Sequence, residues 1–486
     1  MQFSFLLTVL LLALAQVEAA PVKPQQRTVT LPLKRLPQRS DLPPTVLLQQ
    51  HINRSHRRHA RMTGREGPSD AELVKRMEKR LHQARYDKRF NRNGVNVPAS
   101  NNEDVGIKGP NRLDSNQLGN GNQNNSSNGF PQAGLDAQNA GNLTIANQPT
   151  TNNSLGLDVE GNDVGYVATV QVGTPPRDFS ILMDSGSADF WIGGEGCQSL
   201  GGGDCGNHVF LGPNSSSSFQ TSGQQFQVTY GSGQVAGDIV ADNVSIAGLD
   251  LAQHVFGVAL LESQDFSNDT TKFDGLMGLA QSPLSNQGVL TPVESLAKNG
   301  LISEAITSYK ISRVSDGLND GEITFGGLDA SKFDSTTLVT VDNVNPQGFW
   351  EASFTVSAGG KDLGLTGRTA ILDTGTTLII APANDAQAVH AMIPGSQSDG
   401  QGGFIIPCTT TTVVSLAFGG KNFDINPVDL LFTPVDPNNL QGDCISGIST
   451  GTIGTPQQWL VGDVFLKNAY YSTNVQKNTI SLAKLV

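Results

Sequence analysis

Ile181-Leu182-Met183-Asp184-Ser185-Gly186-Ser187 is the stretch that decides the fold, because Ala370-Ile371-Leu372-Asp373-Thr374-Gly375-Thr376 repeats it. In each copy an apolar run ends in an aspartate, a hydroxyl residue, a glycine and a second hydroxyl residue. A second element also repeats, an apolar pair followed by a glycine, and it lies 94 residues after Asp184 (Gly278) and 89 residues after Asp373 (Gly462). Two halves with the same internal order predict a duplicated body with pseudo-twofold symmetry.

The sequence around these motifs is typical of short strands joined by tight turns. Apolar residues alternate over residues 164–172 and 226–230, which is the period of a half-buried strand. The second run leads into Gly231-Ser232-Gly233 and predicts a hairpin with an aromatic residue, Tyr230, just before its turn. The composition agrees, since 16% of the residues are charged and 54 are glycines. Helices are expected to be few.

Charge divides the chain into a basic N-terminal part and an acidic body. Residues 20–112 carry a net charge of +12, and residues 113–486 carry −23. An acidic body excludes nucleic-acid binding by that body. The opposite charges predict that the basic part docks on the body itself.

Residues 1–19 are predicted to be a signal peptide. The apolar run 3–15 has the length of a signal-peptide core and is too short to span a bilayer, and small residues at 17–19 follow it as a cleavage site. A buried N-terminal helix is the alternative. No second apolar run of spanning length exists, and the last residues, 484–486, include no lipid-anchor tail. We therefore expect export without a membrane anchor, to the outside of the cell or to an acidic vacuole.

Residues 20–100 are predicted to be a basic propeptide and residues 101–156 a flexible linker rich in Asn and Gly, so that order begins near Leu157. Within the propeptide, residues 69–90 predict a charged helix that begins with a capping box of Ser69 and Glu72. The propeptide contains five dibasic pairs, Lys34-Arg35, Arg57-Arg58, Lys75-Arg76, Lys79-Arg80 and Lys88-Arg89.

Four cysteines, an even number, fit an oxidising compartment. Cys197 and Cys205 would close a small loop, and Cys408 and Cys444 a larger one. Metal binding is the alternative, but no histidines cluster near either pair and the spacing is not that of a zinc site. Eight glycosylation sequons are present, at Asn53, Asn124, Asn125, Asn142, Asn152, Asn214, Asn243 and Asn268.

Taken in order, the motifs of residues 157–486 resemble those of pepsin-family aspartic proteases. Besides the two Asp-Ser/Thr-Gly turns, the matching stretches are 230–233 (YGSG), 273–279 (FDGLMGL) and 459–463 (WLVGD). The resemblance implies an all-β, bilobal pepsin-like fold with a central cleft and few short helices. Its two pseudo-twofold-related β lobes would span 157–345 and 346–486. The resemblance also implies the disulfides Cys197–Cys205 and Cys408–Cys444.

The resemblance assigns catalysis to Asp184 and Asp373. Peptide hydrolysis without a metal or a nucleophilic side chain needs an activated water and a proton donor. In this family two carboxyls that share one proton supply both, because neighbouring like charges cannot both ionise cheaply. The charged carboxylate would take a proton from the water, while the protonated one polarises the scissile carbonyl. No cofactor and no metal ion is implied.

The residues next to each aspartate have implied roles as well. Gly186 and Gly375 let the backbone turn tightly and direct N–H groups at the carboxylates. Ser187 and Thr376 match the hydroxyls that hydrogen-bond those carboxylates. An isolated Asp-Ser/Thr-Gly is usually an ordinary β-turn, and only the duplicated context favours catalysis.

Tyr230 matches the flap tyrosine that closes over substrate, and Trp191 matches the tryptophan that supports its hydroxyl. An ordinary hairpin aromatic and simple core packing are the respective alternatives. Positions that bind substrate are matched by Gly231, Ser232, Gly375, Thr377 and Leu276. Fungal relatives often carry an aspartate at the position of Ser232, where it is associated with accepting lysine beside the scissile bond. Because this chain has a serine there, we expect a preference for bulky apolar residues at the cut.

The resemblance makes the propeptide an intramolecular inhibitor whose lysine, between Lys75 and Lys108, would plug the site until acid weakens the docking. An unstructured leader removed by another protease is the alternative, and the mature chain would start between 90 and 157. The predicted function is an acid endopeptidase that acts as a monomer on protein and peptide substrates and binds pepstatin-type inhibitors. A catalytically dead binding protein and an adhesive surface protein are the competing interpretations, which both aspartates and Tyr230 disfavour.

Overall fold

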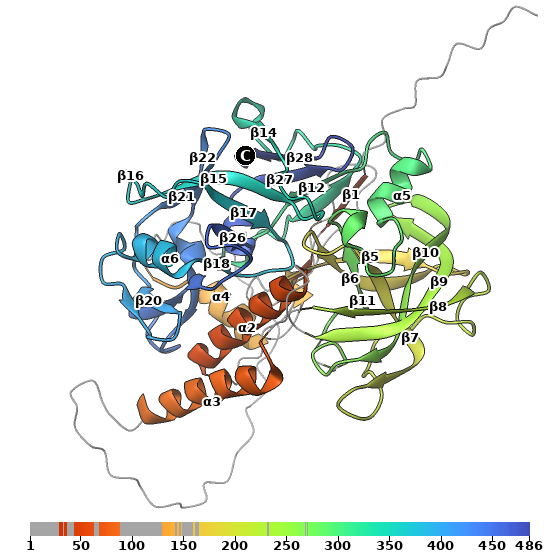
Figure 1. Cartoon of the computed structure of the whole chain (residues 1–486), viewed down its shortest axis with the longest axis horizontal. Helices are drawn as coiled ribbons and strands as arrows, with labels where there is room; N and C mark the ends of the chain where they lie inside the picture. Colours follow the sequence, from red (N-terminus) through yellow and green to blue (C-terminus); the bar gives the residue numbers. More distant parts are fainter. Residues whose placement is uncertain are drawn as a thin grey trace, which may run out of the picture.

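The structure, a computed structural model, describes residues 29–32, 34–35, 43–62, 68–87, 129–140, 143–144, 147, 159–160 and 165–486, except 231–232, 268 and 270. The predicted signal peptide and most of the predicted linker lie outside these residues. Two β lobes stand side by side, with two helices lying across one side of them (Figure 1). The mostly β, bilobal fold confirms the prediction.

The N-terminal lobe is built on a sheet of eight strands. In spatial order these are β2 (Lys34–Arg35), β5 (Tyr166–Val172), β6 (Arg177–Asp184), β11 (Gly275–Gly278), β7 (Phe190–Ser199), β10 (Leu249–Glu262), β9 (Gln234–Ile246) and β8 (Gln220–Thr229). The alternation predicted for β5 is confirmed, because Tyr166, Ala168, Val170 and Val172 are all buried in the core.

The C-terminal lobe repeats this arrangement. Its main sheet runs β22 (Lys421–Ile425), β21 (Val414–Phe418), β15 (Glu351–Ala358), β17 (Arg368–Leu372), β26 (Gln458–Val461), β18 (Ile379–Ala381) and β25 (Ile448–Thr450), with β16 (Lys361–Asp362) paired to β15. β17 pairs in parallel with β26 as β6 pairs with β11, and β26 and β11 each pair antiparallel with the strand after the catalytic turn. The predicted duplication is therefore present in the strand pairing.

A sheet of six strands connects the lobes in the order β1 (Val29–Pro32), β13 (Glu322–Phe325), β12 (Ile306–Lys310), β27 (Tyr470–Asn474), β28 (Thr479–Ala483) and β14 (Val339–Asp342). β1 comes from the predicted propeptide. Two smaller sheets complete the strands: β19 (Gln397–Ser398), β20 (Phe404–Pro407), β24 (Asp443–Ser446) and β23 (Leu431–Pro434) in one, and β3 (Leu143–Thr144) with β4 (Val159–Glu160) in the other.

The helices of the body are short: α5 (Pro292–Lys298), α6 (Ala383–His390), α7 (Asp463–Leu466) and the 3₁₀ turns η1 (Ser282–Leu284), η2 (Val314–Asp316), η3 (Ser335–Thr337) and η4 (Pro427–Leu430). The two long helices, α2 (Pro44–Met62) and α3 (Asp70–Asp87), both belong to the predicted propeptide. The helix predicted over 69–90 is confirmed as α3, and the Glu72 N–H donates to Ser69 Oγ. Among the described helices, none is both long and apolar enough to cross a membrane.

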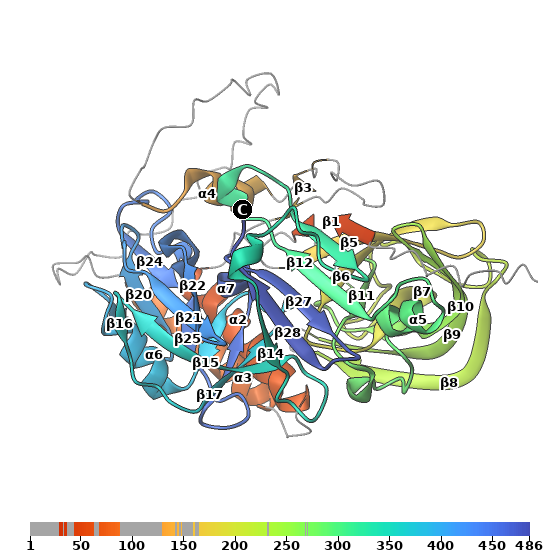
Figure 2. The same cartoon turned by 90° about the horizontal axis from the view of Figure 1, so that it is seen from above.

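One stretch of the predicted linker packs on the body. Phe130 is 5% exposed and belongs to the main hydrophobic core, and its N–H donates to the carbonyl of Leu440 over 2.7 Å. Helix α4 (Gln132–Ala140) follows and lies on the opposite side of the molecule from α3 (Figure 2). The expectation that order begins near Leu157 was therefore wrong, because a single aromatic anchor among polar residues left no periodic pattern.

Candidate active site

The two Asp-Ser/Thr-Gly turns occupy matching places in the two lobes. Asp184 is the last residue of β6, and Asp373 follows β17 directly. In each lobe a glycine of the second repeated element faces the turn: a Cβ added at Gly278 would lie 2.5 Å from the Asp189 nitrogen, and one at Gly462 would lie 1.9 Å from the Thr376 carbonyl oxygen. The repeated glycines are therefore required by the close approach of the backbone to the turn.

Hydrogen bonds between the lobes hold the two turns together. The Ser185 N–H donates to Thr374 Oγ1 over 2.9 Å, and the Thr374 N–H donates to Ser185 Oγ over 3.0 Å. Each hydroxyl also donates across the lobe boundary, to the carbonyls of Leu372 and Met183 respectively. All of these groups are buried, so the pairing is rigid and fully satisfied. The sequence showed the hydroxyl residues but gave no indication of this exchange.

Both aspartates are fully buried, and matching donors hold both carboxylates. Asp184 Oδ1 accepts from the Gly186 N–H over 2.9 Å, and Oδ2 accepts from Ser187 Oγ over 2.5 Å. Asp373 has the same two contacts, from the Gly375 N–H over 2.9 Å and from Thr376 Oγ1 over 2.6 Å. The predicted partners of the aspartates are thus brought together, and each carboxylate has one fixed orientation.

Comparison with known proteins agrees with this geometry. The family model described as eukaryotic aspartyl protease matches residues 165–485, which include both turns. The chain belongs to this family. Among curated relatives, the "Probable aspartic-type endopeptidase CTSD" of Arthroderma benhamiae is 37% identical over 342 residues, 70% of this chain and 64% of the relative. The match thus spans somewhat less than two thirds of that relative's length.

Two further relatives of this aspartyl protease family member are informative. Rhizopuspepsin of Rhizopus chinensis is 35% identical over 318 residues, covering 65% of this chain and 77% of the relative. The embryonic pepsinogen of Gallus gallus is 28% identical over 362 residues, covering 74% and 86%. Similarity therefore extends to fungal and animal members of the aspartyl protease family.

The hydrogen bond expected between Trp191 and Tyr230 is present. The Trp191 indole N–H donates to the Tyr230 hydroxyl over 2.9 Å, and both side chains are buried. Phe266 packs edge-on against Tyr230, and both belong to a hydrophobic cluster that includes Leu276. Leu276, one of the predicted substrate-binding residues, therefore faces this cluster, while Thr377 is buried beside the second catalytic turn. Gly231 and Ser232 lie outside the described residues.

Replacing Trp191 should weaken catalysis through the flap. In Trp191→Phe the Tyr230 hydroxyl loses its buried donor, so we expect kcat/KM to fall by about tenfold, the equivalent of one buried hydrogen bond. The matched control is Trp459→Phe, which removes an indole bond to Asp385 in the other lobe. Steady-state kinetics should show the loss for Trp191→Phe alone. An equal loss in both variants would mean that Trp191 only stabilises the fold.

Two tyrosines beneath the turns were not found from the sequence. The rings of Tyr309 on β12 and Tyr471 on β27 stack with 5.2 Å between centroids. Burial raises the pKa of Tyr309 well above its usual value, and the neighbouring Tyr471 and both catalytic aspartates add to this. Burial raises the pKa of Tyr471 in the same direction. Both phenols therefore stay protonated, so the side chains beneath the aspartates carry no charge.

The cysteine pairing is confirmed, since Cys197 is bonded to Cys205 and Cys408 to Cys444. Glu262 lies close enough to the first pair to suggest a metal site by distance, but both sulfurs are already used in the disulfide. Glu262 is 3% exposed, and burial raises its pKa to about 7, with His208 opposing and Asp274 reinforcing the shift. This carboxyl is therefore a pH-sensitive element of the N-terminal lobe and not a metal ligand.

Glu262→Gln should stabilise the protein at neutral pH. The folded chain keeps a proton on Glu262 that the unfolded chain releases near its ordinary pKa of 4.5. The free energy of unfolding therefore falls as pH rises from about 4.5 to 7, by roughly 3 kcal/mol, and stays low above that window. Urea unfolding at about pH 5 and 7.5 should show this fall in the parent chain and not in the variant. Glu195→Gln, at a half-exposed carboxyl of the same lobe, serves as the control, and an equal gain there would contradict the assignment.

Proposed function

We propose that the chain is an aspartic endopeptidase that hydrolyses proteins at acidic pH and is made as a self-inhibited zymogen. The observation that carries this is the pair of matching turns in which two buried aspartates, each held by an N–H and a hydroxyl, meet between the lobes. In the proposed mechanism one carboxylate takes a proton from the attacking water, while the other carboxyl donates a hydrogen bond to the scissile carbonyl. The fixed hydroxyl and N–H donors hold each carboxylate in one orientation, as this mechanism requires.

A preference for bulky apolar residues fits the wall beside Asp373. The apolar side chains of this wall come from the strands that flank the second turn: Ile371, Leu378, Ile380 and Leu460. Leu47, Leu48 and Ile52 of helix α2 pack against the same cluster. Since the propeptide itself places apolar groups on this surface, we infer that substrates do so as well.

Helix α2 touches both lobes, which suits an inhibitor. Its apolar residues cover the C-terminal lobe, whereas Arg57 faces the carboxylate of Asp265 in the N-terminal lobe. Strands β1 and β2, also from the propeptide, extend sheets of the body. Of the lysines proposed to plug the site, Lys75 and Lys79 lie exposed on α3, and Lys88 and Lys108 lie outside the described residues.

Two histidines give the docked propeptide a response to acid. His51 is buried edge-on against Phe432, and burial, with Arg54 adding, lowers its pKa to about 3. His56 is half-buried beside Arg76 and Glu72 of α3, and burial lowers its pKa to about 4, with Arg76 adding and Glu72 opposing. Both are neutral while docked. Docking is therefore strongest above about pH 6.5 and weakens as pH falls below it.

Brief acidification of the full chain tests this proposal. At about pH 4 we expect self-cleavage followed by hydrolysis of denatured haemoglobin, and pepstatin should stop both. Activity at neutral pH without cleavage of the propeptide would contradict the zymogen. Self-cleavage that pepstatin does not inhibit would contradict the aspartate mechanism. Intact chain without any hydrolysis would favour a binding protein on the same fold. Export to the cell exterior or an acidic vacuole and action as a monomer complete the proposal.

A further inference from the structure

A buried ion pair joins the propeptide to the C-terminal lobe. Arg80 of α3 is 1% exposed, and its Nη1 donates to Asp399 Oδ2 over 2.5 Å, while the Asp399 side chain is 6% exposed. The other two nitrogens also donate: Nη2 to the Gln401 carbonyl over 3.2 Å, and Nε to Gln49 Oε1 over 3.0 Å. The lobe thus presents two acceptors, a carboxylate and a carbonyl, to two nitrogens of one guanidinium. This arrangement suits arginine better than lysine.

The acceptor is held in place by the lobe and not by the propeptide. Asp399 Oδ1 accepts from the N–H groups of Gln401 over 2.7 Å and Gly403 over 2.9 Å. The loop is fixed in turn by the Thr450 N–H, which donates to the Gly402 carbonyl over 2.7 Å. Two backbone hydrogen bonds, in a loop fixed by a third, therefore keep the carboxylate oriented whether or not Arg80 is present.

The loop that carries this acceptor is linked to the second aspartate turn through two paired strands. Thr450 ends β25, which pairs with β18, and β18 begins six residues after Asp373. Leu48 of α2 reaches the same loop, since a Cβ added at Gly403 would lie 2.5 Å from Leu48 Cδ2. The chain's own propeptide thus contacts this wall in two ways. Apolar side chains of α2 lie near the second turn, and the Arg80 guanidinium lies farther from it.

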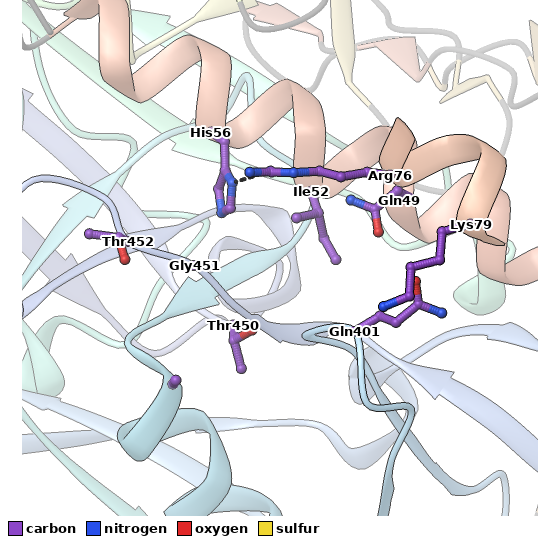
Figure 3. Close-up of a pocket in the computed structure, with 10 residues that line it drawn as sticks. Gln49, Ile52, His56, Arg76, Lys79, Gln401, Thr450, Gly451 and Thr452 are labelled. Carbon is purple, nitrogen blue, oxygen red and sulfur yellow. Dashed lines mark hydrogen bonds between the residues drawn. The ribbon is translucent and has the colours of Figure 1, made fainter. Parts of the chain in front are cut away.

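The propeptide does not fill the surface completely. A cavity of about 330 Å³ remains between the two helices and the lobe, lined on one side by Gln49, Ile52, His56, Arg76 and Lys79 and on the other by Ala383, Gln401, Thr450, Gly451 and Thr452. Figure 3 shows Gln401 and Thr450 facing Gln49 and Lys79 across it. An extended peptide lying along this wall would therefore have room beside Gln401, which is next to the Asp399 acceptor.

We propose that Asp399, with the Gln401 carbonyl, forms an arginine-binding subsite of the released enzyme. This rests on the proposed release of the propeptide, whose Arg80 then vacates the carboxylate. The subsite selects substrates that carry a guanidinium several residues from an apolar cut. Departure of Arg80 leaves a preorganised carboxylate, and a substrate arginine restores the hydrogen bonds that the carboxylate lost.

Acid-activated full chain should be assayed at about pH 5 with peptides that share one apolar cut and carry a single arginine, lysine or citrulline walked along both sides of it. At one position we expect kcat/KM to be about tenfold higher for arginine than for citrulline, with lysine between, which is the usual size for a charged hydrogen-bonded pair. In Asp399→Asn this ratio should fall to about one. Asp362→Asn, at an exposed carboxyl of the same lobe, should keep it.

Hydrolysis with equal rates for arginine and citrulline at every position would overturn the subsite and leave the proposed function standing. If no peptide were hydrolysed, the proposed function would be wrong. The arginine subsite would then be tested by measuring peptide binding instead of hydrolysis. For that arm, an Asp184→Asn chain that also carries Arg80→Gln is held at about pH 5, where docking of the propeptide is weakened and the acceptor is exposed. A fluorescent arginine peptide should bind this chain at least about tenfold more tightly than the same chain with Asp399→Asn. Equal binding would refute the subsite.

Discussion

Asp184→Asn is expected to lower the hydrolysis of a protein substrate by about 10³-fold or more, because an amide can neither take a proton from water nor share one with Asp373. The fold should not change. An asparagine Oδ1 still accepts from the Gly186 N–H, as Asp184 Oδ1 does, and the exchange between Ser185 and Thr374 does not involve the carboxylate. Rates at about pH 4 and circular dichroism of the same samples measure both parts of the prediction.

The control for this variant is Asp178→Asn, an exposed aspartate on the same strand, β6. It removes one negative charge from the same strand without touching the turn, so we expect unchanged rates. Asp373→Asn should equal Asp184→Asn, since the two aspartates have matching donors and act on one water. A variant at either position that kept a tenth of the parent rate would show that one aspartate suffices, and the paired mechanism would be wrong.

The catalytic turns could be predicted because their signal is local and occurs twice. Asp184 and Asp373 end apolar strands, and the residues that hold their carboxylates follow within three positions in the sequence. The support of Tyr230 by Trp191 spans 39 residues and could be expected only through the family resemblance. Contacts between residues a few positions apart can be predicted from a single sequence, whereas contacts between distant residues require knowledge of the fold.

Contacts between distant segments explain what the sequence did not reveal. Arg80 and Asp399 are 319 residues apart, and both are ordinary charged residues in a polar context. Tyr309 and Tyr471 face each other only because β12 pairs with β27. Nothing in the spacing of these residues indicates that they are in contact, so only the three-dimensional structure shows which residues pair.

Helix α2 was missed for a different reason. The helix is amphipathic, but its apolar side chains that reach the body are few and stand among arginines and histidines, so its mean hydropathy is low. The polar stretch Ser472-Thr473-Asn474, which is buried in β27, is also stabilised from a distance. Polar residues there form their own bonds, such as Ser308 Oγ to Ser472 Oγ over 2.7 Å and Asn474 Nδ2 to Glu304 Oε2 over 2.6 Å. Each segment is therefore stabilised by a partner elsewhere in the chain, which its own composition does not show.

His51→Phe should make the zymogen harder to activate by acid. Phenylalanine keeps an aromatic ring against Phe432 and cannot be protonated. In the parent chain at about pH 4, His51 is protonated when the propeptide is released and neutral when it is docked. This difference lowers the stability of the docked state by roughly 3 kcal/mol. The variant avoids this cost. We expect its self-cleavage to need a pH lower by about half a unit to one unit.

The pH dependence itself is the sharper measurement. If His51 takes up one proton on release, the slope of the logarithm of the self-cleavage rate against pH, between about pH 6 and 4, should fall by about one in the variant. His254→Phe is the matched control: burial lowers the pKa of His254 to about 4, but this histidine stacks on Phe190 and Phe256 within the N-terminal lobe. It should change the acid stability of the body and leave the release slope intact. An unchanged slope in His51→Phe would place the acid trigger on carboxylates instead, because His51 would then have no part in the protons taken up when the propeptide leaves.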